Sequence, residues 1–294
     1  MSLGLAAGLL RCPVCRDLLT IDERSVRCGA GHSFDVAREG YVTLLGGSGV
    51  KVSGDTADML AARANFLEAG HYQPIVDGVV SAVTVSAVTV SAVTVSAVTS
   101  PTAILEIGAG TGHYLANVLD VHPEAVGIGF DVSKPAARRI AKRHPRVAAV
   151  VADAWRDWPF ADAAFSHVMS IFAPRNAPEI HRVLVPGGAY VVVTPQADHL
   201  AELLQRIDLV RVDQDKADRL RQTLEGRFTL ESTDHVRFTV DLSAAEAGQA
   251  IAMGPSGHHL DAAGLAALIE SLPVRSTVTV AVNVAVYRAS ITSE

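Results

Sequence analysis

The chain has 294 residues, of which 49% are hydrophobic, so it can bury a sizeable core in one large domain or two smaller ones. Charged residues make up 19% and the net charge is −6, which excludes a disordered chain and argues against a general nucleic-acid coat protein. This balance still allows a local basic patch.

A module with clustered cysteines begins the chain. Cys12, Cys15, Cys28 and His32 follow the spacing C-x2-C-x12-C-x3-H, and the sequence has no other cysteine. Two close pairs of this kind, each in a tight turn, converge on one tetrahedral Zn²⁺ through three thiolates and an imidazole. Because four protein ligands leave no open position, we predict a structural zinc site. The alternative is a set of small buried cysteines beside an unrelated surface histidine.

The same cysteines indicate the compartment. Three clustered thiols do not suit a disulfide framework, and they indicate a reducing environment. The first residues are mildly apolar but have no basic residue before their short apolar run, so we predict no signal peptide. We therefore expect a cytoplasmic protein.

Arginines surround this module, and the aromatic Tyr41 follows it. Arginines beside an aromatic side chain suit contacts to RNA phosphates and bases. Acidic residues balance much of the charge, so a purely solvated set of arginines is an equal alternative. The arginines are Arg11, Arg16, Arg24, Arg27 and Arg38.

A connector follows the module. Residues 46–54 are rich in Gly and Ser and predict a linker. The next stretch has apolar residues at helical spacing, with Asp55 or Thr56 as its N-cap and Gly70 at its end. A second helix is predicted from about Gln73, with a proline in its first turn.

The pentapeptide VSAVT then occurs four times in tandem, from Val80 to Thr99. A period of five matches neither a strand nor a helix, so we expect no stable apolar face. The regular Ser and Thr content and the lack of flanking aromatics argue against a membrane span. The repeat would either continue the preceding helix or be mobile, and we predict no function for it.

Strand and helix patterns alternate from residue 100 onward. This alternation predicts an α/β fold, with a Rossmann-like parallel sheet and helices on both faces. The final alternating stretch, residues 275–288, predicts a terminal strand antiparallel to the rest. The strands are predicted near residues 102–107, 125–130, 147–152, 164–171 and 188–194, and the helices near 113–120, 134–143, 177–184 and 197–207.

The most informative stretch is Ile104–Leu119. A buried-type strand ends in Glu106, and Gly108, Gly110 and Gly112 follow at alternate positions before a helix. Such a turn lets the backbone approach a ligand closely, at the edge of the sheet where α/β proteins bind ligands.

Two acids follow the next two strands. Asp131 can accept hydrogen bonds from both ribose hydroxyls of an adenosine, and the side chain or backbone at Asp153 can face an adenine edge. The glycine pattern is G-x-G-x-G rather than the G-x-G-x-x-G of nicotinamide enzymes. Together with Glu106 these features favour S-adenosylmethionine over NAD or FAD, and hence a class I methyltransferase. The alternative is that the two acids only cap turns or helices.

The order of several strings resembles the 23S rRNA guanine-N1-methyltransferases of the RlmA/TlrB type. These strings are the cysteine module, FDVAREGYVTLL, GDTADMLAARANFLEAGHYQP and the methyltransferase core, and only the VSAVT repeat departs from the pattern. The string AMGPSGHH at residues 252–259 is more similar to the Gram-positive, macrolide-resistance branch. The resemblance implies methylation of N1 of one guanine in a domain II hairpin of 23S rRNA, and tylosin- or mycinamicin-type resistance.

The resemblance also implies site residues. The family's zinc ligands match Cys12, Cys15, Cys28 and His32. Its cofactor-binding residues match Tyr72, Tyr114, Leu115 and His199, in addition to the glycine turn and the acids. The patterns along the sequence divide the chain into a zinc-binding, RNA-recognition module (1–49), a helical connector with the repeat (50–99) and the methyltransferase domain (100–294). The resemblance leaves open whether the protein is a homodimer.

No catalytic base is predicted. Guanine N1 carries a proton, so a base or a donor aimed at O6 would help. The candidates are His113, Glu179, His258 and His259, while Trp155 and Trp158 could stack on a flipped guanine, with packing favoured for Trp158. Two other functions stay open: a small-molecule methyltransferase with a structural zinc finger, and a non-enzymatic RNA- or ribosome-binding protein.

Overall fold

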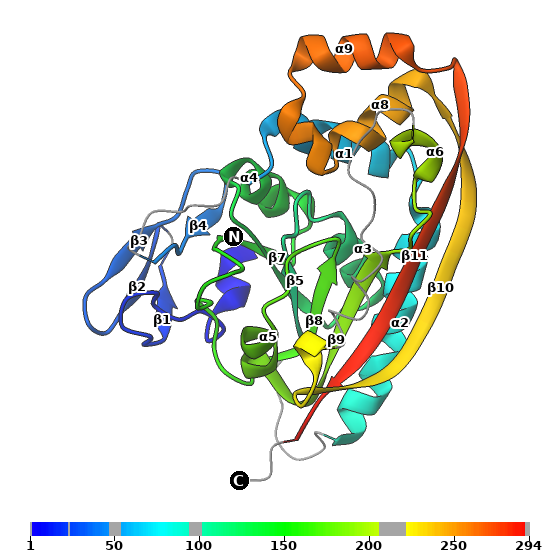
Figure 1. Cartoon of the computed structure of the whole chain (residues 1–294). Helices are drawn as coiled ribbons and strands as arrows, with labels where there is room; N and C mark the ends of the chain where they lie inside the picture. Colours follow the sequence, from blue (N-terminus) through cyan, green and yellow to red (C-terminus); the bar gives the residue numbers. More distant parts are fainter. Residues whose placement is uncertain (1, 23, 47–53, 94–101, 206–221, 292–294) are drawn as a thin grey trace.

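The computed structural model describes residues 2–22, 24–46, 54–93, 102–205 and 222–291. Its described strands form one eight-stranded sheet, in the order β10-β11-β9-β8-β5-β6-β7-β4, and one three-stranded sheet (Figure 1). The large sheet carries the α/β fold that the alternating pattern predicts.

Five parallel strands make the centre of the large sheet. They match the five predicted runs, and each is buried along almost its whole length because helices cover both faces. The strands are β5 (Ala103–Ile107), β6 (Val126–Asp131), β7 (Val147–Val151), β8 (Phe165–Ile171) and β9 (Leu184–Pro195).

Alternate residues of these strands build two cores, one on each face of the sheet. Ile104 packs with the helices α2 (Gln73–Val93), α3 (His113–Val121) and α4 (Lys134–Arg143). The next residue, Leu105, packs on the opposite face. That face is covered by η1 (Ser2–Ala6) and α5 (Ala177–Val183). The period of two in a strand thus sorts neighbouring side chains into different layers.

The N-terminal module is continuous with the large sheet, because the strand that follows its own small sheet pairs with a strand of the large one. Its own sheet is formed by β1 (Leu19–Ile21), β2 (Ser25–Cys28) and β3 (Ser33–Asp35). The next strand, β4 (Tyr41–Thr43), pairs in parallel with β7 and forms an edge of the large sheet. A boundary at residue 49 therefore places a strand of the large sheet in the first module, and the division at residues 49 and 99 stays a prediction.

The connector forms α1 (Ala57–Glu68) and α2, as predicted. Thr56 caps α1 by accepting a hydrogen bond from the amide of Met59. Part of the VSAVT repeat continues α2 as far as Val93, and residues 94–99 lie outside the described part.

The expectation of no stable apolar face in this repeat is wrong for its described beginning. Ala82, Val83 and Ser86 are buried at helical spacing, and α2 packs against β9 and β11. The five-residue period does not prevent this, because almost every residue of the repeat is small or apolar and any face can be buried. No helix within the described residues is long and apolar enough to cross a bilayer.

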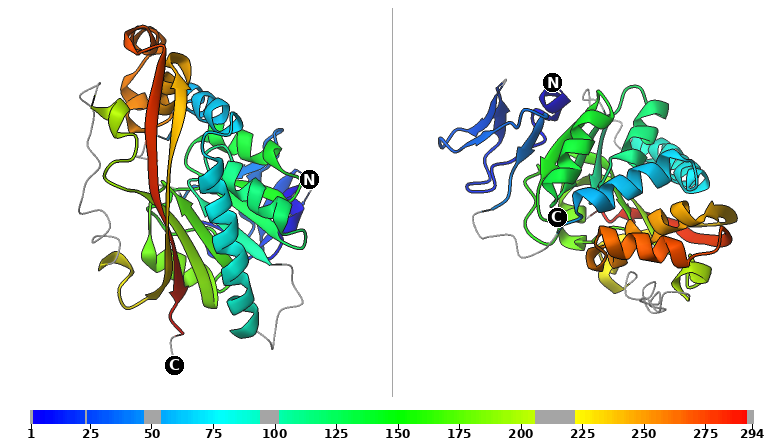
Figure 2. Two further views of the ribbon diagram at one scale, coloured as in Figure 1. Left: turned by 90° about the vertical axis from the view of Figure 1, so that its right-hand side faces the viewer. Right: turned by 90° about the horizontal axis from the view of Figure 1, so that it is seen from above.

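Two long antiparallel strands complete the other edge. The terminal strand β11 (Arg275–Ala289) pairs antiparallel with β9, as predicted, and also with β10 (Phe228–Ser243), which was not predicted. Both extend beyond the parallel strands and carry α8 (Ala244–Ala252) and α9 (Ala262–Ser271) at their far end (Figures 1 and 2).

The helices α1 and α8 pack against each other near the carboxyl ends of the parallel strands. The helix expected at residues 197–207 is short in the described chain, where α6 spans Ala201–Leu204. The glycine turn lies at the carboxyl edge of the sheet. This edge is therefore covered by α1, which precedes the parallel strands in the sequence, and by α8, which follows them.

Candidate functional site

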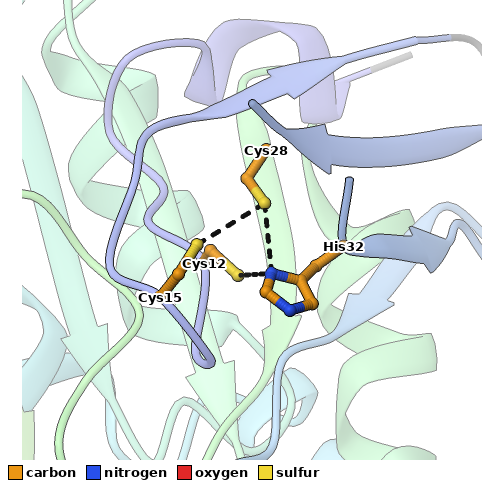
Figure 3. Close-up of side chains that lie close together, drawn as sticks. All are labelled: Cys12, Cys15, Cys28 and His32. Atoms are coloured by element: carbon orange, nitrogen blue, oxygen red, sulfur yellow. Dashed lines mark hydrogen bonds between the residues drawn. The ribbon is translucent and has the colours of Figure 1, made fainter. Parts of the chain in front are cut away.

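The four predicted zinc ligands converge in one cluster (Figure 3). Their ligand atoms all lie within 4.8 Å of one another. Nδ1 of His32 is 3.3 Å from Sγ of Cys28 and 3.6 Å from Sγ of Cys12, and Sγ of Cys15 is 3.5 Å from Sγ of Cys28. A tetrahedral Zn²⁺ with bonds of about 2.0–2.3 Å sets its ligand atoms about 3.5–3.8 Å apart, so the donor set fits.

Local turns bring the four ligands together. The amide of Arg16 donates to the carbonyl of Cys12, and the amide of Gly31 donates to the carbonyl of Cys28. Gly31 has φ of 88°, a left-handed conformation that glycine adopts at little cost, and it turns the chain so that His32 faces Cys28. The zinc site is structural, since all four positions belong to the protein.

The arginines of this module have different roles. Nη1 of Arg16 donates to the carbonyl of Trp158 and so joins the module to the large domain. Nη1 of Arg11 donates to the carbonyl of Arg16, within the module. Arg24, Arg27 and Arg38 are exposed. If the arginines of this module contact RNA, the three exposed ones are the residues available to do so.

The glycine turn follows β5 at the carboxyl edge of the sheet. Gly108, Gly110 and Gly112 have φ of 57°, 54° and 71°, which side chains other than glycine rarely adopt. A Cβ atom at Gly108 would lie 3.0 Å from Cβ of Ala173, in the segment after β8. The turn thus needs glycine both for its conformation and for space.

Glu106 supports this turn from below. Its Oε2 accepts a hydrogen bond from the amide of Leu115, the third residue of α3. The N-cap of α3 is Gly112, which has no side chain to satisfy that amide, so Glu106 supplies the missing acceptor. Burial raises the pKa of Glu106 to about 8. The carboxyl is therefore largely protonated at neutral pH. Its hydrogen bond within the described residues is the one from the amide of Leu115 in α3.

Asp131 at the end of β6 closes the other side of the turn. Its Oδ2 accepts from the amide of Gly110 at 3.1 Å, and its Oδ1 accepts from the amide of Ser133 at 2.9 Å. Burial raises the pKa of Asp131, and these two hydrogen bonds oppose the shift. Each oxygen of a carboxylate can accept a second hydrogen bond, so Asp131 can still bind ribose hydroxyls beside the glycine turn.

Asp153 lies after β7, but its oxygens are used locally. Oδ1 accepts from the amide of Trp155 at 2.9 Å, and Oδ2 lies 3.6 Å from Nε of Arg156. This is the turn-capping arrangement that the sequence left open as an alternative. Unlike Asp131, whose hydrogen bonds in the described chain come from two neutral amides, Asp153 also faces the guanidinium of Arg156, which competes with a cofactor hydroxyl for its oxygens.

Tyr72 and His199 meet in a buried pair. Oη of Tyr72 lies 3.2 Å from Nε2 of His199. Nδ1 of His199 accepts from the amide of Ala281, so the neutral imidazole carries its proton on Nε2 and donates it to Tyr72. Burial lowers the pKa of His199 to about 4, which keeps the ring neutral. The hydroxyl proton of Tyr72 is then free to donate to a ligand.

Tyr114 and Leu115, at the start of α3, have different roles at the candidate cofactor site. The side chain of Leu115 packs on β6, where a Cβ at Gly127 would lie 3.0 Å from it, so this residue shapes the core beneath the turn. Tyr114 is buried, and its hydroxyl has no hydrogen-bond partner among the described residues. A buried hydroxyl without a partner is costly and suits a site that a ligand completes.

The candidate bases differ in whether their side chains are already held by other groups. Nδ1 of His113 is hydrogen-bonded to Nη2 of Arg143, and burial lowers the pKa of His113 to about 4. Glu179 accepts from the amide of Trp158 and from Arg182, which fixes it within the fold. Nε2 of His258 lies 3.7 Å from Oδ1 of Asp55, next to the glycine turn. The side chain of His259 lies outside the described part.

The two tryptophans also differ. Trp158 is fully buried against Phe130 and donates from Nε1 to the carbonyl of Ala154, so it is a packing residue, as favoured from the sequence. Trp155 is 59% exposed and keeps its face accessible to a base.

Two residues of the candidate cofactor site were not found from the sequence. Arg63 of α1 reaches the glycine turn, and Phe172 after β8 stacks on His199 with 5.7 Å between ring centroids. Phe172 has φ of 54°, which is strained for an aromatic residue, and it is 41% exposed. Phe172 lies in the segment SIFAPRN at the end of β8, and Arg63 occupies an ordinary helical position without a motif around it.

Comparisons with known proteins match both parts of the chain. A zinc-ribbon family model described as RlmA, N-terminal, matches residues 10–47, and a methyltransferase-domain model matches residues 104–188. The zinc-ribbon match contains all four zinc ligands. The methyltransferase match contains the glycine turn, Asp131 and Asp153.

Similar proteins span nearly the whole chain. The 23S rRNA (guanine(748)-N(1))-methyltransferase of Streptomyces fradiae is 43% identical over 95% of this chain and 96% of its own length. A Micromonospora griseorubida protein, assigned by name to the 23S rRNA (guanine-N(1)-)-methyltransferases, is 46% identical over 95% of this chain and 97% of its own. A Bacillus subtilis protein with the same kind of name is 32% identical over 67% of this chain and 68% of its own.

Proposed function

The chain belongs to the RlmA-type family of 23S rRNA (guanine-N1)-methyltransferases, and from this premise we propose that it methylates N1 of G748 in 23S rRNA. The observation that carries the choice of guanine is the near full-length similarity to the Streptomyces fradiae enzyme, whose name states that position. It is an S-adenosylmethionine-dependent enzyme with a zinc ribbon of three cysteines and one histidine.

We place the acceptor in a hairpin of domain II, and the protein in the cytoplasm, where ribosomal RNA is made and modified. Methylation at this position would lower susceptibility to macrolides of the tylosin or mycinamicin type. The exposed arginines Arg24, Arg27 and Arg38 would contact the RNA backbone, since arginine binds phosphate through parallel hydrogen bonds.

When bound, S-adenosylmethionine supplies a methyl group on a positively charged sulfur, and its transfer is an in-line displacement in which positioning does most of the work. In this proposal Asp131 holds the ribose through its two carboxylate oxygens. The neutral His199 orients Tyr72, whose hydroxyl donates to the cofactor. Glu106 and Leu115 act indirectly, because they fix the glycine turn and the first turn of α3.

The small-molecule alternative needs a test that leaves the chain intact. Deleting the first module would also remove β4 and the buried residues Leu3 and Leu10, which belong to the core of the large sheet. Loss of activity after such a deletion would therefore say little about the acceptor.

The direct test is methyl transfer from labelled S-adenosylmethionine to a domain II hairpin transcript. A methyl on N1 blocks Watson–Crick pairing, so we expect reverse transcription to stop next to G748 only after incubation with the protein. The matched control is a hairpin with adenine at that position, which should incorporate no label there. Label on another guanine would revise the position, and label only on small molecules would overturn the proposal.

A further inference from the structure

Arg63 connects three parts of the cofactor site. Its Nη1 lies 2.5 Å from Oδ2 of Asp55, and its Nη2 donates to the carbonyl of Met253 at 2.6 Å. A Cβ atom at Gly110 would lie 2.8 Å from the same Nη1. The guanidinium therefore rests directly on the glycine turn, between the start of α1 and the end of α8.

The charges around this guanidinium are mostly negative. Asp131 and Asp55 are close enough to interact electrostatically with each other, and Arg63 opposes the effect of Asp55 by favouring the charged form of Asp131. Tyr114 is the second residue of α3, which begins directly after Gly112, so the guanidinium and this phenol border the same glycine turn. An anionic group entering among these acids needs a cation to receive it.

A second observation points to a ligand in the same place. The hydroxyl of Tyr114 is buried and lacks a partner among the described residues. Tyr114 belongs to the core that packs on this face of the sheet. A donor held in this state is satisfied when an acceptor binds next to it.

We propose that Arg63 binds the carboxylate of the amino-acid part of S-adenosylmethionine, with the hydroxyl of Tyr114 as a second donor. Guanidinium matches a carboxylate with two parallel hydrogen bonds, and Arg63 already pairs with the carboxylate of Asp55. Asp131 would receive the ribose, so the two ends of the cofactor would be held by opposite charges across the turn. This inference rests on the use of S-adenosylmethionine and not on the identity of the RNA.

Another arginine near the turn provides a comparison. Arg143 packs its Cβ near Gly112, but its guanidinium turns toward Glu68 and His113. Arg63 is thus the better placed of these two cations for a ligand on the turn.

The test compares two ligands that differ only by the carboxylate. S-adenosylhomocysteine has it, and its decarboxylated analogue keeps the adenosine and the amine. By isothermal titration calorimetry with the full chain, we expect Arg63→Gln to weaken S-adenosylhomocysteine by about 10–100-fold and the analogue by less than about threefold. Arg63→Lys keeps the charge but loses the second hydrogen bond, so its loss should be intermediate.

The controls separate binding from folding. Arg138→Gln removes an arginine that pairs with Glu39 on the exposed side of α4, and should change neither affinity. Equal weakening of both ligands by Arg63→Gln would show a structural role and overturn the inference, as would a carboxylate-selective loss in Arg143→Gln instead.

The wild-type chain gives an independent check that does not need a folded variant. It should bind S-adenosylhomocysteine at least about tenfold more tightly than the decarboxylated analogue, and equal affinities would overturn the inference. A protein that methylates some other acceptor would give the same pattern, so failure of the proposed RNA substrate and failure of this inference are distinguishable.

Discussion

The zinc site and the cofactor site are held together by different forces. The zinc ligands come from two short turns within residues 12–32, and the ribbon around them has only three short strands of its own. The cofactor site draws on residues from Asp55 to Ala281, and the cores on both faces of an eight-stranded sheet fix their positions.

This difference determines what each site can tolerate. The ribbon has only three short strands, and apart from Leu19 and Val26, which pack with the core of the large sheet, the metal supplies much of its stability. The cofactor site is fixed by the paired strands of the large sheet and the cores on its two faces, so its geometry does not depend on any single interaction. The zinc site should fail as a unit, whereas the cofactor site should fail one interaction at a time.

The largest expected effect is loss of the metal. His32→Ala removes one ligand, and we expect the zinc content, measured by mass spectrometry, to fall from one per chain to less than about a tenth. Structural zinc contributes about 10–16 kcal/mol in small zinc domains, so the ribbon should unfold. Hydrogen exchange should show lost amide protection in β1, β2 and β3, while β5, β6 and β8 stay protected.

The matched variant His32→Cys supplies a thiolate in place of the imidazole, and a site of four thiolates also binds zinc, so the metal should be retained. Because β4 pairs with β7, partial loss of protection at that edge is expected in His32→Ala. Full zinc content and full protection in His32→Ala would remove the contrast between the two sites.

The zinc site could be predicted from the sequence because all of its information is local. A ligand spacing within 21 residues fixes which atoms meet, and no distant contact is needed. The five central strands were also predictable, since each is a short apolar run ended by turn residues. The glycine turn and Asp131 followed, because the carboxyl ends of parallel strands share one edge.

The features that were missed depend on distant pairing. β10 carries polar residues on most of its length and is recognisable only beside β11, more than thirty residues later in the chain. The sequence around Arg63 is that of any polar position on a helix. Only the structure shows that its guanidinium lies against the glycine turn at Gly110. For the repeat, the period alone was misleading, since small apolar residues allow a buried face at any register.

A smaller effect is expected at the two acids of the cofactor site. Asp131→Asn should weaken S-adenosylhomocysteine about 10–100-fold, because charged hydrogen bonds to two hydroxyls are lost. Asp153→Asn should weaken it by less than about threefold, since Asp153 already pairs with the guanidinium of Arg156, whereas the hydrogen bonds to Asp131 in the described chain come from neutral amides. Calorimetry on both variants measures the difference. A greater loss in Asp153→Asn would mean that the adenosine is oriented toward β7 rather than β6.

The remaining effect concerns stability rather than ligand binding, and it has the opposite sign, because removing the Glu106 carboxyl should stabilise the chain. The folded pKa of about 8 lies above the ordinary value of 4.5, as burial disfavours the carboxylate. Between these two pH values the folded state binds more protons than the unfolded state, so the free energy of unfolding falls as the pH rises. Glu106→Gln removes this dependence, and its amide oxygen can still accept from Leu115.

Glu106→Gln and the wild type should therefore be about equally stable at pH 5, and the variant should be more stable by on the order of 2–4 kcal/mol at pH 8. Urea unfolding followed by circular dichroism at several pH values measures this difference. Glu124→Gln is the matched control, because Glu124 is exposed before β6 and its removal should leave the curve parallel to that of the wild type. A difference that is constant with pH would show that Glu106 is charged in the folded chain. It would then stabilise α3 as an anion at the helix N-terminus rather than as a neutral acceptor.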